Sequence, residues 1–363
     1  TKRCLALLDE AWPRDGEQQP RALPLDAPQI DRFEIVRELG RGGFGIVYLA
    51  DDPKLGRAVA LKIQRPETIL SADLRRRFLR EAKTAAILAH PNIVAVYDAE
   101  VAGVRCWIAS EYCAGTTLKE WLRRRNSPVP ARAAVQLVLA LTEAVSYAHT
   151  RGVLHRDIKP SNVLLQPKTD SLDSPNANGA RRRALHQSEN VDGLIDSGEL
   201  DDFSPKLADF GLARFDDESA EETRSGAQLG TPNYMAPEQI EGDRSRVDRR
   251  TDVYGLGVLL YELLTGRLPF EGQTRTDTLA QVLLKEPVRP RQLRRDLPRD
   301  LEAIVLRCLE KRPERRYSSA LALADDLRRF LNNEPTQARP LASWELLGKW
   351  AWRHPALAVA LSM

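Results

Sequence analysis

The chain has 363 residues, of which 42% are hydrophobic and 29% are charged, which suits two or three modest domains or one large two-lobed domain. Its 54 Lys and Arg nearly balance its 51 Asp and Glu, and this balance argues against a nucleic-acid-binding protein. The four cysteines, at positions 4, 106, 113 and 308, form no CxxC pair, which excludes a disulfide scaffold and a zinc ribbon.

The N-terminal third of the chain combines a leader with a small sheet. Residues 1–32 carry four prolines, scattered charges and little periodicity, which predicts a flexible leader. Short runs of β-forming residues then begin, interrupted by a segment at 71–89 whose apolar residues follow a helical period. These signals predict five strands and one helix. The predicted strands are 33–39, 46–50, 58–63, 93–101 and 104–112.

After Gly115 the signals become mostly helical. The stretch 131–150 has helical apolar periodicity, and 251–265 is apolar nearly all round and stops at Gly266, which predicts a buried helix. Two further helices are predicted at 300–310 and 318–331. The chain is thus predicted to be an α+β protein with a small sheet lobe followed by a larger helical lobe.

Residues 166–204 differ in composition from the rest of this region. They contain eight acidic residues against four basic ones, five serines and few large apolar residues. Such a segment buries too little apolar surface to offset the entropy lost on ordering. It is therefore predicted to be a disordered surface insertion.

A glycine-rich segment, Gly40 to Val47 (GRGGFGIV), lies between two predicted strands. A dinucleotide-binding loop would be followed by a helix, whereas strand-forming residues follow here. The pattern therefore favours a flap whose backbone N–H groups approach nucleotide phosphates. A plain hairpin turn is the alternative.

Lys62 lies in an apolar strand and needs an acidic partner if it is buried. Glu81 shares the apolar face of the predicted helix, because Phe78 and Ala85 lie three positions before it and four after it. We therefore expect an ion pair between Lys62 and Glu81 that leaves the lysine able to reach phosphate oxygens.

Three further motifs follow in order: HRDIKPSN at 155–162, Asp209-Phe210-Gly211, and Met235-Ala236-Pro237-Glu238. With the glycine-rich segment and Lys62, they make the chain resemble the eukaryotic-type (Hanks-type) protein kinases, specifically the bacterial receptor-like Ser/Thr class, over residues 33–332. The resemblance implies a bilobal fold. Residues 33–113 would form a small lobe of five antiparallel strands and one helix. A larger, mostly helical lobe would occupy 114–332.

The resemblance also implies catalytic roles. Asp157 would orient the substrate hydroxyl and accept its proton, Lys62 would bind the α- and β-phosphates of ATP, and Lys159 would steady the γ-phosphate. Asn162 and Asp209 would hold Mg²⁺, with Mn²⁺ as the alternative ion, because oxygen donors suit hard cations. Glu81 would support Lys62.

An ATP site is implied between the lobes. Apolar side chains would enclose the adenine, and backbone groups of Glu111 and Cys113 would pair with its edge. Ordinary core packing is the alternative for the apolar members. The complete expected ATP site consists of Leu39, Gly40, Gly42, Gly45, Val47, Ala60, Lys62, Glu111, Cys113 and Leu164.

Two supporting contacts are implied by the same resemblance. Asp252 would accept hydrogen bonds from the backbone of His155 and Arg156, and Glu238 would pair with Arg316. His155 itself is expected to be a packed structural residue and not a base.

Regulation is expected between Asp209 and Glu238. Lys159 together with Thr231 matches the Ser/Thr specificity pattern of the family. We expect Thr223 and Ser225 to be autophosphorylated, because a phosphate there could pair with Arg156. Transfer between two copies in a homodimer would be one route.

The segment 344–363 holds three of the six tryptophans and then a short apolar run. Aromatic and cationic residues before an apolar run predict the start of a transmembrane helix. A short amphipathic helix packed on the kinase domain is the alternative. The first expectation makes the chain the cytoplasmic part of a single-pass membrane enzyme, with 333–363 as its juxtamembrane segment.

The predicted function is a non-specific protein serine/threonine kinase that acts on protein substrates with ATP. A pseudokinase scaffold that binds nucleotide without catalysis is the alternative, although Lys62, Asp157 and Asp209 are all present. A small-molecule phosphotransferase is less favoured, because such enzymes lack the 230–238 run.

Overall fold

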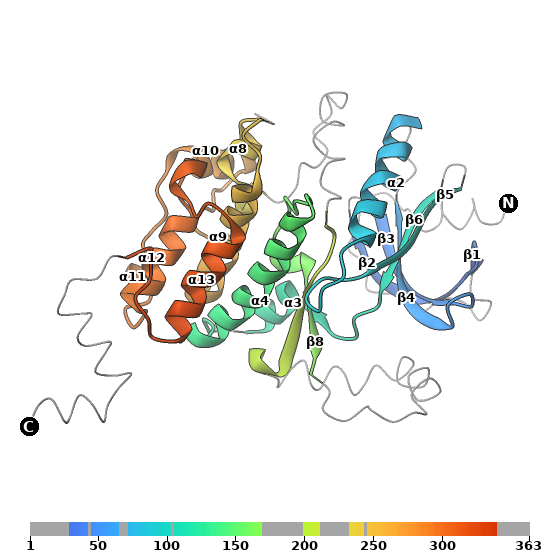
Figure 1. Ribbon diagram of the computed structural model, residues 1–363, viewed down its shortest axis with the longest axis horizontal. Coiled ribbons are helices and arrows are strands. Elements are labelled where there is room, and N and C mark those ends of the chain that lie inside the picture. Colours follow the sequence, from blue (N-terminus) through green and yellow to red (C-terminus); the bar gives the residue numbers. More distant parts are fainter. Residues whose placement is uncertain are drawn as a thin grey trace, which may run out of the picture.

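The computed structural model describes residues 29–42, 45–64, 72–102, 105–125, 127–168, 199–210, 232–242 and 245–339. These residues form a sheet lobe and a helical lobe that lie side by side (Figure 1). The predicted bilobal α+β fold is confirmed.

The sheet of the first lobe has six antiparallel strands in the order β1-β2-β3-β4-β6-β5. This is one strand more than predicted, because β1 pairs Gln29 with Glu34 and Ile30 with Phe33 inside the segment predicted as leader. The two-residue run carried no recognisable period. The strands are β1 (Gln29–Ile30), β2 (Phe33–Gly42), β3 (Gly45–Asp52), β4 (Arg57–Gln64), β5 (Val96–Ala102) and β6 (Arg105–Glu111).

Each face of this sheet carries its own apolar cluster, because alternate residues of a strand point to opposite faces. On one face, helix α2 (Ala72–Ala86) packs Phe78 and Ala82 against Cys106 and Ile108 of β6. On the other face, Trp107 belongs to a second cluster together with residues of β2, β3 and β4. Lys62 pairs in register with Ile108 and so lies on the same face as α2.

The second lobe is built around one buried helix, α9 (Arg249–Thr265). Asp248 caps its start by accepting from the N–H of Arg250 at 2.7 Å, and Gly266 ends it with φ of 68°. Helices α4 and α12 pack against α9, and α13 packs against α4. The other helices of the described lobe are α3 (Leu118–Arg124), α4 (Ala131–Thr150), α8 (Pro237–Ile240), α10 (Arg275–Leu284), α11 (Pro290–Leu293), α12 (Arg299–Cys308) and α13 (Ala320–Leu331).

A small sheet of β7 (Thr116–Thr117), β8 (Val163–Pro167) and β9 (Phe203–Leu207) lies where the two lobes meet. Its register joins Val163 to Leu207 and Pro167 to Phe203. Strands β8 and β9 therefore include both ends of the predicted insertion at 166–204, which narrows the part without a described structure to 169–198. In the sequence it follows the C-terminal end of β8 and precedes the N-terminal end of β9, whereas Asn162 and Asp209 adjoin the opposite ends of these strands.

The expected membrane location is corrected here. No helix in the described ranges is both long enough and apolar enough to cross a membrane. The segment 344–363, on which the expectation rested, lies outside those ranges. The cytoplasmic-side placement of the chain is therefore withdrawn.

We expect Gly257→Ala to destabilise the protein. A Cβ at position 257 would lie 2.4 Å from the Cβ of Cys308, and overpacking of this kind costs about 1–3 kcal/mol, against a gain of about 1 kcal/mol in helix propensity. Thermal unfolding measures the net effect, with Gly40→Ala as the control because no atom lies within 4 Å of its added Cβ. Equal melting temperatures for both variants would contradict this packing.

Candidate active site

The segment 155–162 is held in shape by one buried carboxylate. Asp252, in the first turn of α9, accepts from the backbone N–H of His155 at 2.9 Å and of Arg156 at 2.7 Å, which confirms the expected contact. His149 of α4 donates from Nε2 to the same carboxylate at 2.7 Å. Burial alone would raise the pKa of Asp252, but the hydrogen bond and charge of His149, with further contributions from His155, outweigh it, so the pKa lies below its usual value.

Arg156 has φ of 67°, a left-handed conformation that costs a residue with a side chain about 1–3 kcal/mol. Its backbone is fixed on both sides, since its N–H donates to Asp252 and its carbonyl accepts from Nε2 of Gln239 at 2.8 Å. These bonds hold the turn that places Asp157 next along the chain.

His155 is a structural residue, as expected. Its ring is buried and packs edge-on against Phe210, with 4.6 Å between ring centroids. Nε2 lies 2.9 Å from the carbonyl of Ala208, which can only accept, and Nδ1 accepts from the N–H of Asp157 at 3.2 Å. The neutral ring with its proton on Nε2 satisfies both contacts, so His155 links the Asp157 turn to the start of the Asp209 segment.

Asp157, Lys159 and Asn162 form one polar cluster. The amide nitrogen of Asn162 donates to the carbonyl of Asp157 at 2.8 Å and to its Oδ2 at 2.9 Å. The ammonium of Lys159 lies 2.6 Å from the same Oδ2. The side chain of Asp157 remains 32% exposed, so a substrate group can reach it.

Lys62 makes its ion pair with Asp209 and not with Glu81, contrary to our expectation. Its ammonium donates to both carboxylate oxygens of Asp209 at 2.9 Å. Burial alone would raise the pKa of Asp209, but the charge and hydrogen bonds of Lys62 outweigh it, and the net pKa is lowered. Two carboxylates were available to Lys62, and the sequence could not rank them because their distances depend on how the lobes meet.

The backbone of Asp209 is also unusual, with φ of 63°. Left-handed non-glycine residues cluster at functional sites. The preceding residue, Ala208, donates its N–H to the carbonyl of Asn162 at 2.8 Å. This bond ties the Asp209 turn to the Asp157 cluster, and the side chain of Asp209 is still 38% exposed.

The donor set of Asn162 and Asp209 fits a magnesium-like ion. Asn162 uses its amide nitrogen on Asp157, so its amide oxygen is the atom that can serve as a ligand, beside the carboxylate of Asp209. In the part of the chain described, no group of three or more His, Cys, Asp or Glu could hold a metal alone. Two oxygen ligands fit Mg²⁺, which proteins usually bind through one or two side chains together with water and substrate phosphates.

The residues expected to line the adenine lie on the less buried sides of their strands. Ala60 and Leu164 are partly exposed, whereas Val59, Leu61, Val163 and Leu165 beside them are buried. Leu39 and Val47 are partly exposed as well. This pattern distinguishes them from ordinary core residues.

The glycine-rich segment forms the β2–β3 connection, with residues 43–44 outside the description. Gly45 starts β3, and a Cβ there would lie 2.0 Å from the carbonyl oxygen of Ile63 on β4. Glycine at this position therefore lets β3 and β4 approach. Gly40 and Gly42 lie at the end of β2 with open space where a Cβ would be.

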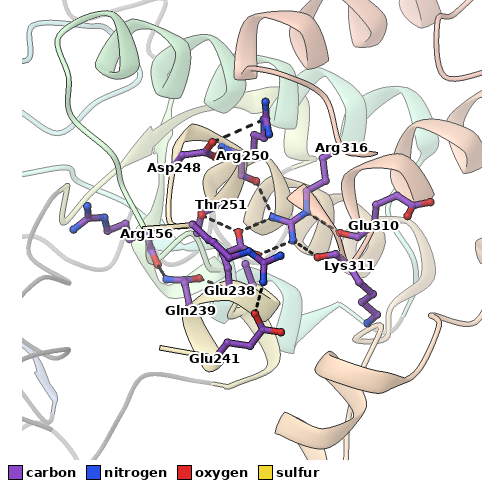
Figure 2. A network of polar contacts seen from close by, with 12 residues as sticks. Arg156, Glu238, Gln239, Glu241, Asp248, Arg250, Thr251, Glu310, Lys311 and Arg316 are labelled. Carbon is purple, nitrogen blue, oxygen red and sulfur yellow. Dashed lines mark hydrogen bonds and ion pairs between the residues drawn. The ribbon is translucent and has the colours of Figure 1, made fainter. Parts of the chain in front are cut away.

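The expected pair of Glu238 and Arg316 is confirmed and lies at the centre of a larger network (Figure 2). Arg316 donates to both carboxylate oxygens of Glu238 at 2.7 and 2.8 Å, and both side chains are fully buried. Arg316 also donates to the carbonyls of Glu310, Lys311 and Arg250. The network fixes α8 to the start of α9, where Asp252 lies.

Two residues of this network were missed by the sequence analysis. Thr251 donates to Glu238 at 2.8 Å, and Gln239 accepts from the N–H of Ala236 while donating to the carbonyl of Arg156. Gln239 stands at the third position of α8, where a side chain can bond the backbone N–H that precedes the helix. This position in the sequence could have predicted the bond of Gln239 to Ala236. Its bond to Arg156 depends on tertiary packing and could not have been predicted.

The expected regulatory hydroxyls, Thr223, Ser225 and Thr231, lie outside the described residues. Of the expected regulatory set, Arg156 lies within the described residues.

We expect Glu238→Gln to cost about 3–5 kcal/mol in the free energy of unfolding, because it leaves Arg316 buried without its charge partner. Urea unfolding measures this loss. The matched control is Glu241→Gln, which breaks an exposed pair with Arg246 at 2.7 Å and should cost about 1 kcal/mol or less. Equal losses in the two variants would refute the assigned role of the buried pair.

Comparisons with known proteins agree with this geometry. A sequence model of the family described as "Protein kinase domain" matches residues 33–327. The chain is 36% identical over 312 residues to serine/threonine-protein kinase PknB of Mycobacterium leprae, covering 85% of this chain and 44% of that protein. It is 34% identical over 304 residues to serine/threonine-protein kinase Pkn1 of Myxococcus xanthus, covering 84% of this chain and 39% of that protein.

The chain therefore spans less than half the length of these curated relatives. Among solved structures, the PknI kinase domain of Mycobacterium tuberculosis aligns with a TM-score of 0.60 at 28% identity, covering 85% of this chain and 99% of that chain. The family match, the fold and the assembled site lead to one conclusion: the chain belongs to the Hanks-type protein kinases and is similar to their bacterial Ser/Thr class.

Proposed function

We propose that the chain is a protein serine/threonine kinase that transfers the γ-phosphate of ATP to Ser or Thr hydroxyls of protein substrates. The observation that carries the proposal is the junction of Asp157, Lys159 and Asn162 beside the Lys62–Asp209 pair. Phosphoryl transfer needs alignment and charge neutralisation more than covalent chemistry. These side chains supply a base, two cations and two oxygen ligands.

Each side chain has a role in this proposal. Asp157 orients the substrate hydroxyl and takes its proton, while the amide nitrogen of Asn162 holds the carboxylate in place. Lys159 neutralises charge on the γ-phosphate, and Lys62 turns from Asp209 to the α- and β-phosphates. Glu81, on α2, supports Lys62 once Lys62 has left Asp209.

The expected metal is Mg²⁺, with Mn²⁺ as the alternative, held by Asn162 and Asp209. When bound, it neutralises negative charge on the phosphates. Before the metal binds, Lys62 keeps the carboxylate of Asp209 ionised by lowering its pKa, and the bound cation would take the place of Lys62 as the partner of this charge.

The adenine is proposed to lie among Leu39, Val47, Ala60 and Leu164, on the partly exposed strand faces. Backbone groups of Glu111 and Cys113 would pair with its edge. The glycines at 40, 42 and 45 keep the backbone above the phosphates free of side chains.

Autophosphorylation at Thr223 and Ser225 is part of the proposal, with transfer between two copies of the chain as the route. A phosphate added there could pair with Arg156, whose backbone is rigidly held by Asp252 and Gln239. Thr231 together with Lys159 is proposed to favour Ser and Thr over Tyr as acceptors.

Labelled phosphate transfer from ATP to the chain itself and to a generic basic protein tests the proposal. We expect Asp157→Asn to lower the rate by about 10²–10⁴, because the positioned base is lost, and Lys62→Met to lower it as well. Mass spectrometry of the active protein should then find phosphate on Thr223 or Ser225.

The matched control is Asp325→Asn on α13, an exposed residue paired with Arg328, which should transfer at the wild-type rate. Equal labelling by wild type and Asp157→Asn would refute the kinase assignment. Tight ATP binding with no transfer would favour the pseudokinase alternative.

A further inference from the structure

A second ion pair joins the sheet lobe to the small sheet where the two lobes meet. Glu111 ends β6 of the sheet lobe, and Lys206 lies on β9 of the small sheet. The ammonium of Lys206 donates to both carboxylate oxygens of Glu111, at 2.7 and 2.9 Å. The side chain of Glu111 is only 22% exposed and that of Lys206 only 15%, so water screens this pair less than a surface pair.

The backbone around this pair is connected as one unit through the loop 90–95. The N–H of Glu111 donates to the carbonyl of Ala95 at 2.8 Å. From the other side, Val94 donates to the carbonyl of Leu207 at 3.0 Å, and Leu207 donates to that of Asn92 at 2.8 Å. The segment preceding Cys113 is therefore attached to β9 through both side chain and backbone.

Each member of the pair is close in sequence to a different part of the proposed ATP site. The backbone of Glu111 is proposed to pair with adenine. Lys206 lies near the end of β9, three positions before Asp209, the proposed metal ligand. Burial, followed by the charge of Glu111, raises the pKa of the Cys113 thiol to about 12, and Lys206 opposes this rise. Both charges thus act on Cys113, the second residue proposed to pair with adenine.

Other charged and titratable groups near the pair do not replace it. Arg57 lies over the ring of Tyr97, 3.3 Å from its centroid. Tyr97 is half-buried, and burial raises the pKa of its hydroxyl, so it stays neutral at pH 7. The contacts that Lys206 makes with charged side chains in the described residues are those to Glu111.

We propose that Glu111 and Lys206 are positioning residues that fix the adenine-binding backbone relative to Asp209, so that losing the pair weakens ATP binding more than it slows phosphate transfer. This inference rests on the proposed function, because that function places the adenine beside Glu111 and the metal at Asp209, three residues after Lys206. Breaking the pair leaves a largely buried charge without a partner. The end of β6 then keeps only its backbone connection to β9 through the loop 90–95 and is held less firmly relative to Asp209.

The experiment compares Lys206→Met, Glu111→Gln and the charge-exchanged double variant Glu111→Lys/Lys206→Glu in the full chain. It measures KM for ATP, kcat, the Kd of Mg-ATP by calorimetry and the melting temperature. Glu143→Gln is the matched control, because it breaks a pair of the same length, 2.7 Å, between α4 and α13.

We expect both single variants to raise KM and Kd for ATP about tenfold, the scale seen for residues that orient metal ligands, with kcat within about twofold of wild type and Glu143→Gln unchanged. The double variant should recover part of the loss. Single variants that lower the melting temperature but leave KM and Kd at the wild-type values would overturn the proposal, whether or not the double variant folds.

The failure of the proposed function has a different signature. A wild-type chain that binds Mg-ATP without transferring phosphate would refute catalysis. The Kd values of the variants would still test whether Glu111 and Lys206 support ATP binding. A wild-type chain that binds no ATP would overturn both proposals.

Discussion

The arrangement of the site depends on the buried carboxylate of Asp252. It binds the backbone N–H groups of His155 and Arg156 and the ring of His149, and it lies in the first turn of α9, where the helix dipole favours a negative charge. This interaction stabilises the left-handed Arg156 and thereby places Asp157 against Asn162 and Lys159. The helix that carries Asp252 is itself fixed by the buried pair of Glu238 and Arg316. The geometry of the proposed catalytic site thus depends on a carboxylate that is itself buried.

The two lobes are joined by ion pairs that end on the same short segment. Lys62 reaches Asp209 from β4, and Glu111 reaches Lys206 from the end of β6. Asp209 has two competing uses, because the carboxylate that binds Lys62 is also the proposed metal ligand. The competition allows an exchange of partners when a nucleotide arrives with its metal. Lys62 can pass to the phosphates and Asp209 to the metal ion, so that neither charge is left without a partner.

Much of the fold and the site follows from the sequence, since local patterns carry the information. The apolar surface of 251–265 predicted a buried helix that ends at Gly266, and the resemblance to the kinase family implied one site for Asp157, Asn162 and Asp209. What could not be predicted depends on tertiary distance. Asp209, the partner of Lys62, lies 147 positions away in the sequence. A lysine in an apolar strand needs an acidic partner, and Glu81 met that requirement equally well. The pair of Glu111 and Lys206 and the second contact of Gln239 left no periodic signal, and a two-residue strand such as β1 is too short to have one.

The measurement that tests the account most directly is the dissociation constant of ATP as a function of Mg²⁺ concentration, compared between wild type and Asp209→Asn. Because Asp209 is assigned as a metal ligand, wild-type ATP binding should tighten as Mg²⁺ is added, and the variant should lose most of that dependence. In the absence of Mg²⁺ the variant should bind ATP at least as well as wild type, since a negative charge near the phosphates has been removed. An unchanged Mg²⁺ dependence in the variant would contradict the account.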